Sequence, residues 1–237
     1  MSGLDLAGRC VLITGAAGNL GRAVAAAFVA RGARLVLVDR DAQALRTAFG
    51  EDDAQRICLA ADLLDAAQVN AAFAAAVARF GSVDTLCNLA GGFRMGEAVH
   101  ETSEATLTFL WNLNVRTLLN MAHAVVPHML AAGGGRIVNV GAFSAQRGVA
   151  AMGAYCAAKD SVARLTESMS AELKGRGVNV NCVLPTIIDT PENRSAMPGA
   201  DPSRWVAPAD LANVIAFLAS DDARAIHGAA LPVTGLV

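Results

Sequence analysis

The residues most suited to chemistry are a tyrosine and a lysine four positions apart. Tyr155 is the only tyrosine of the chain, and Lys159 follows it by about one helical turn, which places both side chains on one helix face. An ammonium group close to a phenol favours the phenolate, so we expect it to lower the pKa of Tyr155 from the usual value of about 10. The pair is therefore a candidate general acid/base. Taken alone, this spacing is also that of an ordinary pair on a helix surface.

A glycine-rich turn is the second candidate for chemistry. The segment T-G-A-A-G-N-L-G spans residues 14–21, follows an apolar run and leads into a helical pattern. Glycines there permit a tight turn and let backbone N–H groups meet a pyrophosphate at the helix N-terminus. Asparagine tolerates positive φ better than other non-glycine residues, so we expect Asn19 to be accommodated in this turn. The predicted cofactor contacts are Gly15, Gly18, Asn19, Leu20 and Gly21.

Two acidic residues follow the next two apolar runs. Asp39 stands about twenty residues beyond the turn, where a carboxylate accepts hydrogen bonds from the hydroxyls of an adenosine ribose. A 2′-phosphate would meet a like charge there, although Arg40 could bind such a phosphate. We therefore predict NAD (NADH) as the cofactor in preference to NADP. Asp62 and Leu63 are expected to contact the adenine, and the alternative for Asp62 is to cap the next helix.

Short apolar runs alternate with alanine-rich helical patterns along the chain. We expect strands at residues 9–14, 34–38, 56–60, 83–87, 135–140, 178–184 and 230–233. Helices are expected at residues 20–30, 42–49, 66–80, 104–131, 153–174 and 209–219, with capping glycines at Gly32, Gly50, Gly81, Gly133 and Gly175. This alternation predicts an α/β fold, a Rossmann-like doubly wound parallel sheet of about seven strands in a single domain over residues 1–237. Ligands of such sheets bind beyond the carboxyl ends of the strands.

The composition narrows the classes of function. The formal net charge is -2 with both signs spread along 237 residues, so we expect no nucleic-acid partner and no membrane partner. No apolar run is long enough to span a bilayer, and the start lacks a signal-peptide pattern. Five widely spaced cysteines favour buried thiols in a reducing compartment, and four histidines lack metal-ligand spacing. We predict a cytoplasmic protein that acts on a small-molecule substrate without a metal.

Taken together, the motifs resemble those of the short-chain dehydrogenase/reductase (SDR) family over nearly the whole chain. They are the turn at 14–21, Asp39, Asp62, N-L-A-G at 88–91, N-L-N-V at 112–115, Y-C-A-A-K at 155–159 and a P-x-x-x-x-T stretch at 185–190. The resemblance implies an NAD-dependent SDR enzyme in which Tyr155 exchanges the proton that accompanies hydride transfer. It further implies that Lys159 holds the nicotinamide ribose and tunes the tyrosine, while Asn114 shapes its helix and anchors a proton-relay water.

The same resemblance assigns the remaining cofactor contacts. It places Asn88, Ala90 and Gly91 along the adenosine side, and Pro185, Ile188 and Thr190 beside the nicotinamide. The catalytic serine of the family would stand thirteen residues before the tyrosine, but that position is Ala142, and Ser144 is the nearest substitute. A methyltransferase, whose first turn is similar, would leave Tyr155, Lys159 and Asn114 without a role.

A narrower similarity to dihydropteridine reductase, which lacks this serine, covers chiefly the second half of the chain. It lies in A-G-G-F at 90–93, G-A-F-S-A at 141–145 and the stretch 184–198. A quinonoid ring is already electrophilic, so hydride can reach it without a donor that polarises a carbonyl. The predicted substrate is therefore a small carbonyl/alcohol or quinonoid compound. The alternative is a catalytically weak NAD-binding sensor or scaffold that has lost the serine.

The substrate side is expected in a lid over residues 186–207, which is rich in proline and polar residues. The residues proposed to form its apolar pocket are Phe93, Met95, Phe143, Met152, Met197 and Trp205, with Arg94 and Arg194 as anchors. Helices 104–131 and 153–174 carry more apolar surface than one sheet face needs, and the family resemblance implies that these helices pair between subunits. We therefore expect a homodimer or homotetramer.

Overall fold

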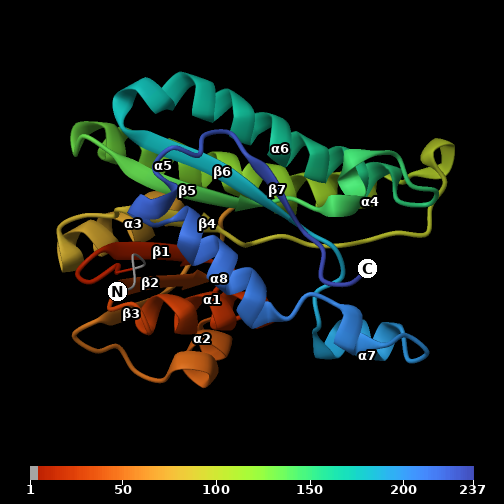
Figure 1. The fold of residues 1–237 in the computed structure, drawn as a ribbon, viewed down its shortest axis with the longest axis horizontal. Helices are drawn as coiled ribbons and strands as arrows, with labels where there is room; N and C mark the ends of the chain where they lie inside the picture. The colour runs from red at the N-terminus through yellow and green to blue at the C-terminus, as the bar shows by residue number, and fades with distance from the viewer. Residues whose placement is uncertain (1–4) are drawn as a thin grey trace.

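The computed structural model describes residues 5–237, which form one seven-stranded sheet between two layers of helices (Figure 1). All strand pairs are parallel, and the strand order is β3-β2-β1-β4-β5-β6-β7. The strands are β1 (Cys10–Thr14), β2 (Arg34–Asp39), β3 (Arg56–Ala60), β4 (Thr85–Asn88), β5 (Gly135–Val140), β6 (Val178–Pro185) and β7 (Ala230–Val233). The order reverses between β1 and β4, which is where ligands of doubly wound sheets bind.

In the described part of the chain, eight α-helices connect or flank these strands. They are α1 (Asn19–Val29), α2 (Ala42–Phe49), α3 (Ala66–Phe80), α4 (Glu104–Trp111), α5 (Thr117–Ala131), α6 (Gly153–Leu173), α7 (Pro191–Ala196) and α8 (Pro208–Leu218). Helices α1, α2 and α8 cover one sheet face, and α3, α5 and α6 cover the other. Helix α7 projects from the sheet body beyond β6 (Figure 1).

Alternation along β1 shows why the sheet is covered on both faces. Val11 and Ile13 are fully buried against the α1 and α8 side, whereas Cys10 and Leu12 are fully buried against the α3 and α5 side. Successive side chains of a strand point to opposite faces, so a strand buried on both sides must be apolar at every position. The continuous apolar runs of the sequence therefore correctly predicted the doubly wound α/β fold.

The long helix expected at 104–131 is interrupted. Residues Asn112–Arg116 form a π-helical segment between α4 and α5, which inserts extra backbone into the helix. Such π-bulges occur frequently at functional sites. The predicted capping glycine of α6 is also displaced, because a short 3-10 turn follows the helix and Gly177, at φ 81°, adopts the left-handed conformation instead of Gly175.

The structure also bears on membrane-spanning helices, metal sites and cysteine pairing. Within residues 5–237, no helix has both the length and the apolar character to cross a membrane. The same part of the chain holds no group of three His, Cys, Asp or Glu side chains placed to bind a metal ion. The cysteines are unpaired, and all except the half-buried Cys58 are buried.

Candidate active site

A cleft of about 590 Å³ opens at the carboxyl ends of the strands, at the reversal of strand order. The predicted cofactor contacts that line it are Gly15, Gly18, Asn19, Leu20, Gly21, Asp39, Arg40, Asp62, Leu63, Ala90, Gly91 and Thr190. These residues come from five separate loops of the chain. Their convergence is what a dinucleotide site of this fold requires.

The glycine-rich turn is shaped by close backbone approaches. Gly15 has φ 64°, and a methyl group added there would lie 3.0 Å from the backbone of Ala90. A methyl group on Gly21 would overlap the carbonyl oxygens of Gly15 and Ala16. Glycine is therefore required at both positions.

Helix α1 begins at Asn19, so the expectation that this residue needs a turn conformation with positive φ is wrong. Gly18 is the N-cap and offers no side chain to the helix, and the first turn of α1 holds no acidic residue. The first N–H groups of a helix have no intrahelical partner and carry a partial positive charge. This helix end therefore suits an anion such as pyrophosphate.

The carboxylate of Asp39 lies at the end of β2 and faces the turn. Its Oδ2 accepts a hydrogen bond from the backbone N–H of Ala17 at 3.1 Å. Asp62 also lines the cleft, and its Oδ1 accepts from the N–H of Leu64 at 2.9 Å. The cap of α3 is Asp65, so the capping alternative for Asp62 is wrong.

Asn88 does not line the cleft. Its side chain is buried at the carboxyl end of β4, and its Nδ2 donates to Oδ1 of Asn139 at 2.9 Å. Asn139 in turn donates to Oγ1 of Thr166 at 2.9 Å, which ties β4 and β5 to helix α6. A buried polar chain of this kind fixes the orientation of the elements that it joins.

Asn114 stands in the π-helical segment and is 2% exposed. Its Nδ2 donates to the carbonyl of Leu110 at 2.9 Å and to that of Gly92 at 3.0 Å, and its Oδ1 accepts from the N–H of Gly92 at 3.1 Å. The side chain thus satisfies a helix carbonyl and binds the loop after β4. The expectation that Asn114 shapes its helix agrees with these contacts.

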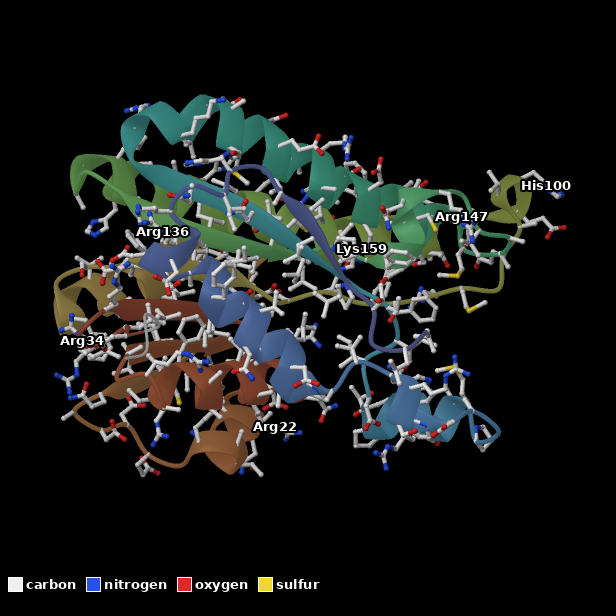
Figure 2. The ribbon with its side chains drawn as sticks, viewed as in Figure 1. Arg22, Arg34, His100, Arg136, Arg147 and Lys159 are labelled. Atoms are coloured by element: carbon white, nitrogen blue, oxygen red, sulfur yellow. The ribbon has the colours of Figure 1, made fainter. Side chains whose placement is uncertain are left out.

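Lys159 is buried on α6 and lies at the centre of the molecule (Figure 2). Its Nζ donates to the carbonyl of Val140, at the end of β5, at 2.9 Å. A methyl group added to Gly91 would lie 3.1 Å from this Nζ and 2.9 Å from Oδ1 of Asn114. Burial lowers the pKa of Lys159 to about 8. The ammonium group therefore stands behind Gly91, which lines the cleft and leaves room for it.

Tyr155 lies in the first turn of α6 and packs edge-on against Phe93, with ring centroids 4.9 Å apart at 85°. Burial raises the pKa of Tyr155 to about 12, and the Cys156 thiol adds to the effect. The expectation that the neighbouring ammonium lowers this pKa is therefore wrong for the protein alone, because desolvation outweighs any attraction to Lys159. At neutral pH the phenol is protonated and able to donate.

Replacing Gly91 with alanine should weaken the site without unfolding the chain. The added methyl group must displace either the Lys159 ammonium or the Asn114 amide, so we expect turnover to fall by about tenfold or more. Steady-state kinetics and the thermal midpoint measure the two effects. Gly175→Ala is the matched control, because a methyl group there meets nothing within 4 Å. Equal activity of the two variants would contradict the placement of Gly91.

The position expected for the family serine holds no hydroxyl. Ala142 is buried after β5 and precedes a short 3-10 turn (Phe143–Gln146) that contains Ser144. The backbone carbonyl of Ser144 accepts a weak hydrogen bond from the Cys156 thiol at 3.7 Å. This contact holds the serine loop against α6, close in sequence to Tyr155.

The segment 186–207 forms a folded flap rather than an irregular loop. Pro185 ends β6, Ile188 pairs with Val206 in an isolated β-bridge, and Thr190 caps α7 by accepting from the N–H of Asn193. Trp205 is only 6% exposed and packs inside, so it does not face an open pocket as expected.

The two arginines expected to anchor a substrate have other partners. Arg194 forms two hydrogen bonds to the carboxylate of Asp189, at 2.6 and 2.7 Å. Arg94 lies over the ring of Phe109 at 4.1 Å from its centroid. Phe93, which contacts Tyr155, and Met95 are in contrast more than half exposed and remain available to a ligand.

Several residues of the site were not predicted from the sequence. The additional residues that line the cleft are Ala61, Leu64, Leu89, Phe109, Asn112, Leu113 and Thr117. Thr14 was also missed as a positioning residue, although its Oγ1 accepts from the N–H groups of Leu89 and Ala90. The threonine in the T-G start of the turn is the one signal that pointed to it.

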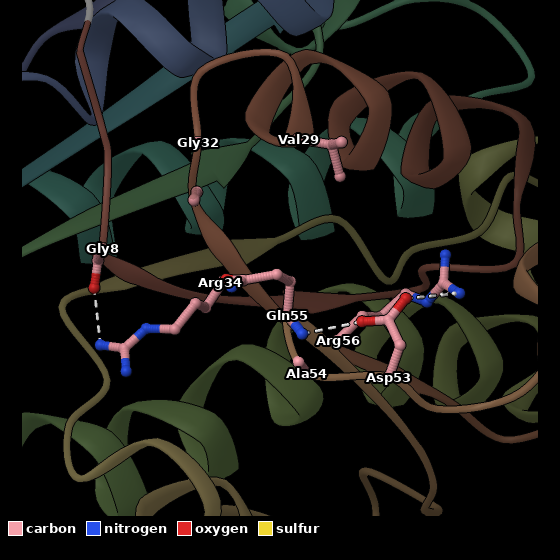
Figure 3. Close-up of a pocket in the computed structure, with 9 residues that line it drawn as sticks. Gly8, Val29, Gly32, Arg34, Asp53, Ala54, Gln55 and Arg56 are labelled. Carbon is pink, nitrogen blue, oxygen red and sulfur yellow. Dashed lines mark hydrogen bonds and ion pairs between the residues drawn. The ribbon is translucent and has the colours of Figure 1, made fainter.

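A second hollow of about 860 Å³ lies at the opposite edge of the sheet, where β2 and β3 begin (Figure 3). Arg34 donates to the carbonyl of Gly8 at 2.6 Å, and Arg56 pairs with Asp53 at 3.2 Å. Both arginines are thus engaged within the protein. None of the predicted site residues lies there, so the cleft at the carboxyl ends is the candidate active site.

Comparison with known proteins agrees with this geometry. A family profile described as short chain dehydrogenase matches residues 9–200. The chain belongs to this family. D-threitol dehydrogenase of Mycolicibacterium smegmatis is 37% identical over 242 residues, which cover 97% of this chain and 93% of that protein. Sorbitol dehydrogenase of Cereibacter sphaeroides is 37% identical over 187 residues, which cover 78% of this chain and 73% of that protein.

Solved structures of short-chain dehydrogenases have the same fold. The crystal structure of 3-ketoacyl-(acyl-carrier-protein) reductase from Brucella melitensis complexed with NADH gives a TM-score of 0.88 at 31% identity, covering 98% of both chains. Levodione reductase gives a TM-score of 0.88 at 30% identity, covering 97% of both chains. The chain is therefore a short-chain oxidoreductase with a Rossmann-like fold, of a family that binds nicotinamide cofactors.

Proposed function

We propose that this short-chain dehydrogenase is an NAD(H)-dependent enzyme that transfers hydride between nicotinamide and a small carbonyl/alcohol or quinonoid substrate, with Tyr155 as the acid/base. The observation that carries the proposal is the position of two polar side chains beside Gly91, which lines the cleft. Lys159 and Asn114 lie against Gly91, and Tyr155 stands one helical turn before Lys159 with an exposed aromatic neighbour, Phe93. This is the arrangement of a general acid supported by a cation.

The residues present fit a dinucleotide. The open N-terminus of α1 suits the pyrophosphate, and the turn before it can form because Gly15 and Gly21 let backbone segments approach where side chains would collide. Asp39 and Asp62 suit the adenosine, and Thr190 with Pro185 and Ile188 would stand on the nicotinamide side. The bound nicotinamide supplies or accepts the hydride.

Asp39 supports a preference for NAD over NADP. Its carboxylate is fixed by the N–H of Ala17, so it stands ready to accept hydrogen bonds from ribose hydroxyls. A 2′-phosphate would meet this negative charge, and the exposed guanidinium of Arg40, which also lines the cleft, would offset part of the repulsion.

The chain's own residues account for the proton. The phenol of Tyr155 is protonated at neutral pH and donates to the substrate oxygen or nitrogen as hydride arrives. Lys159, held by the carbonyl of Val140, offers a positive charge that stabilises the phenolate so formed. Asn114 keeps the backbone of its π-helical segment in place, where a relay water would bind.

The absence of a hydroxyl at Ala142 supports an acceptor that is already electrophilic. Without a second donor to polarise a simple ketone, about a hundredfold or more in rate is commonly lost. A quinonoid substrate does not need that donor, which is the reason why the sequence predicted a substrate of the dihydropteridine reductase type. D-threitol and sorbitol dehydrogenases among the relatives support the alcohol class instead. The alternative, an NAD-binding sensor or scaffold, rests on the same alanine.

Binding and turnover assays distinguish these possibilities. We expect thermal-shift titration to show stabilisation by NADH at lower concentration than by NADPH, and no effect of S-adenosylmethionine. NADH oxidation against a quinonoid dihydropterin and a panel of ketones and polyols should then show turnover with at least one class. Binding of NADH without turnover on any of them would support the sensor alternative, and an equal response to NADPH would contradict the role of Asp39.

The assembly and the compartment belong to the same proposal. Leu107 and Trp111 are 43% and 42% exposed on the same helix, α4, and such a pair suits helix pairing in a homodimer or homotetramer. We propose a cytoplasmic enzyme with a small-molecule substrate and no nucleic-acid or membrane partner. Size-exclusion chromatography with light scattering measures the assembly.

A further inference from the structure

The glycine-rich turn and the flap at 186–207 are joined by a side-chain contact. Nδ2 of Asn19, the first residue of α1, donates to Oε2 of Glu192 on α7 at 2.8 Å. Nη2 of Arg22, one turn further along α1, donates to Oδ1 of Asn19 at 2.7 Å. The amide of Asn19 therefore bridges a guanidinium on the cofactor side and a carboxylate on the flap.

The hydrogen bond between Glu192 and Asn19 connects the flap to the glycine-rich turn. Residues 190–198 make side-chain hydrogen bonds to Ile188 and Asp189, which belong to the flap itself. In the described chain, the bond between Glu192 and Asn19 is the one from these residues that reaches outside the flap. Thr190, two residues before Glu192, lines the same cleft as Asn19. A contact that fixes the position of Glu192 therefore also restrains Thr190, which lines the cleft.

We propose that Asn19 and Glu192 form a tether that holds α7 against the start of α1, beside the cofactor cleft, and slows the release of the bound dinucleotide. The inference rests on the proposed binding of NADH. It makes both side chains positioning residues, since neither is required to touch the reacting atoms. A glycine at position 19 would offer no side chain to the flap, so the tether depends on the asparagine that this chain carries there.

The charges around the tether stabilise the contact between α7 and the start of α1. Glu192 is kept ionised, because its own backbone N–H and the Thr190 hydroxyl, and then the Asn19 amide and Arg22, lower its pKa. A carboxylate is favourable near the N-terminus of α1, although it repels a pyrophosphate bound there. The positive charge of Arg22, which donates to Asn19, offsets that repulsion. The tether is thus expected to act on the rate of release more than on the chemistry.

The test compares the dissociation rate of NADH from the full-length protein and its variants by stopped-flow displacement. The variants are Asn19→Ala, Glu192→Ala, the double variant and Glu192→Gln, with Ser195→Ala on the exposed side of α7 as the control. For one charge-assisted hydrogen bond at the surface, we expect each single alanine variant to release NADH roughly two- to fivefold faster. The double variant should match the singles, since one contact is lost in all three. Glu192→Gln, which can still accept from Asn19, should stay close to the wild type.

A second measurement needs no cofactor. Trypsin can cut the flap after Arg194, and the alanine variants at 19 and 192 should be cut faster there than the wild type or Ser195→Ala. Additive effects in the double variant, unchanged release, slower release or unchanged cutting would each overturn the tether. Failure of the wild type to bind NADH would instead contradict the proposed function, and the cutting rates would still test the tether.

Discussion

Replacing Tyr155 with phenylalanine should reduce turnover by roughly a hundred- to ten-thousandfold, because the variant has no group that can exchange the proton. The binding of NADH should not change, since the edge-on contact between the rings of residue 155 and Phe93 needs no hydroxyl. Single-turnover oxidation of NADH measures the chemical step, and fluorescence titration measures the binding.

Ser161→Ala is a matched control on the same helix. Its hydroxyl is exposed and donates to the carbonyl of Ala157 at 2.8 Å, away from the cleft. Turnover of this variant should stay within about twofold of the wild type, in keeping with the small effects of surface substitutions. A Tyr155→Phe enzyme that remained as active as this control would show that the proton comes from elsewhere.

Replacing Lys159 with methionine should remove most activity and yet change stability in a pH-dependent way. Burial lowers the pKa of this lysine from 10.5 to about 8, so at pH 7 the folded protein bears the cost of a desolvated charge. The cost is present while the folded lysine is charged and disappears as the pH rises from 8 through 10.5. Relative to the variant, the wild type should therefore gain stability over that range.

The expected gain of the wild type relative to the variant is about 2 to 3 kcal/mol in the free energy of unfolding between pH 7 and pH 10. Urea denaturation of both proteins at the two pH values measures it. The variant also leaves the carbonyl of Val140 without its partner, but that loss is the same at both pH values. Tyr155 is present in both proteins, so its titration cancels. A pH-independent difference would mean that Lys159 is not desolvated as described.

Much of the fold could be predicted because its main signals are local. Strands β3, β5 and β7 and helices α2 and α3 begin and end at the expected residues, since apolar runs, capping residues and glycines mark their ends. Parallel strands that are joined by helices can adopt few topologies, because the crossovers are right-handed. The doubly wound sheet could therefore be predicted from the alternation of strands and helices. Strand β4 was displaced towards its carboxyl end, where Asn88 pairs with Asn139 of β5.

The cleft could be predicted to the extent that it is built from motif positions. The glycine turn, Asp39 and Gly91 share one cleft because the sheet topology brings the strand ends together. The π-helical segment could not be predicted, because it depends on the fit of Asn114 between Leu110 and Gly92, which are far apart in the sequence. The contacts of Phe109 and Leu113 with the cleft were missed for the same reason.

Electrostatic expectations were the weakest. Spacing alone suggested that Lys159 would lower the pKa of Tyr155, whereas burial raises it. Burial is a property of the whole fold, so no pair of positions can give it. The prediction that Arg194 anchors a substrate was wrong for the same reason. Its partner is Asp189, five residues earlier on the flap, and the sequence alone does not show whether an arginine pairs with such a carboxylate or with a ligand.

The proposed chemistry depends most on where the phenol of Tyr155 stands relative to bound nicotinamide. A crystal structure of the complex with NADH measures this directly. We predict that the phenol oxygen faces the hydride-bearing carbon of the ring across the space for a small substrate, with Lys159 Nζ on the adjoining ribose. A complex in which the phenol points away from the ring would contradict the proposed chemistry and leave only the fold.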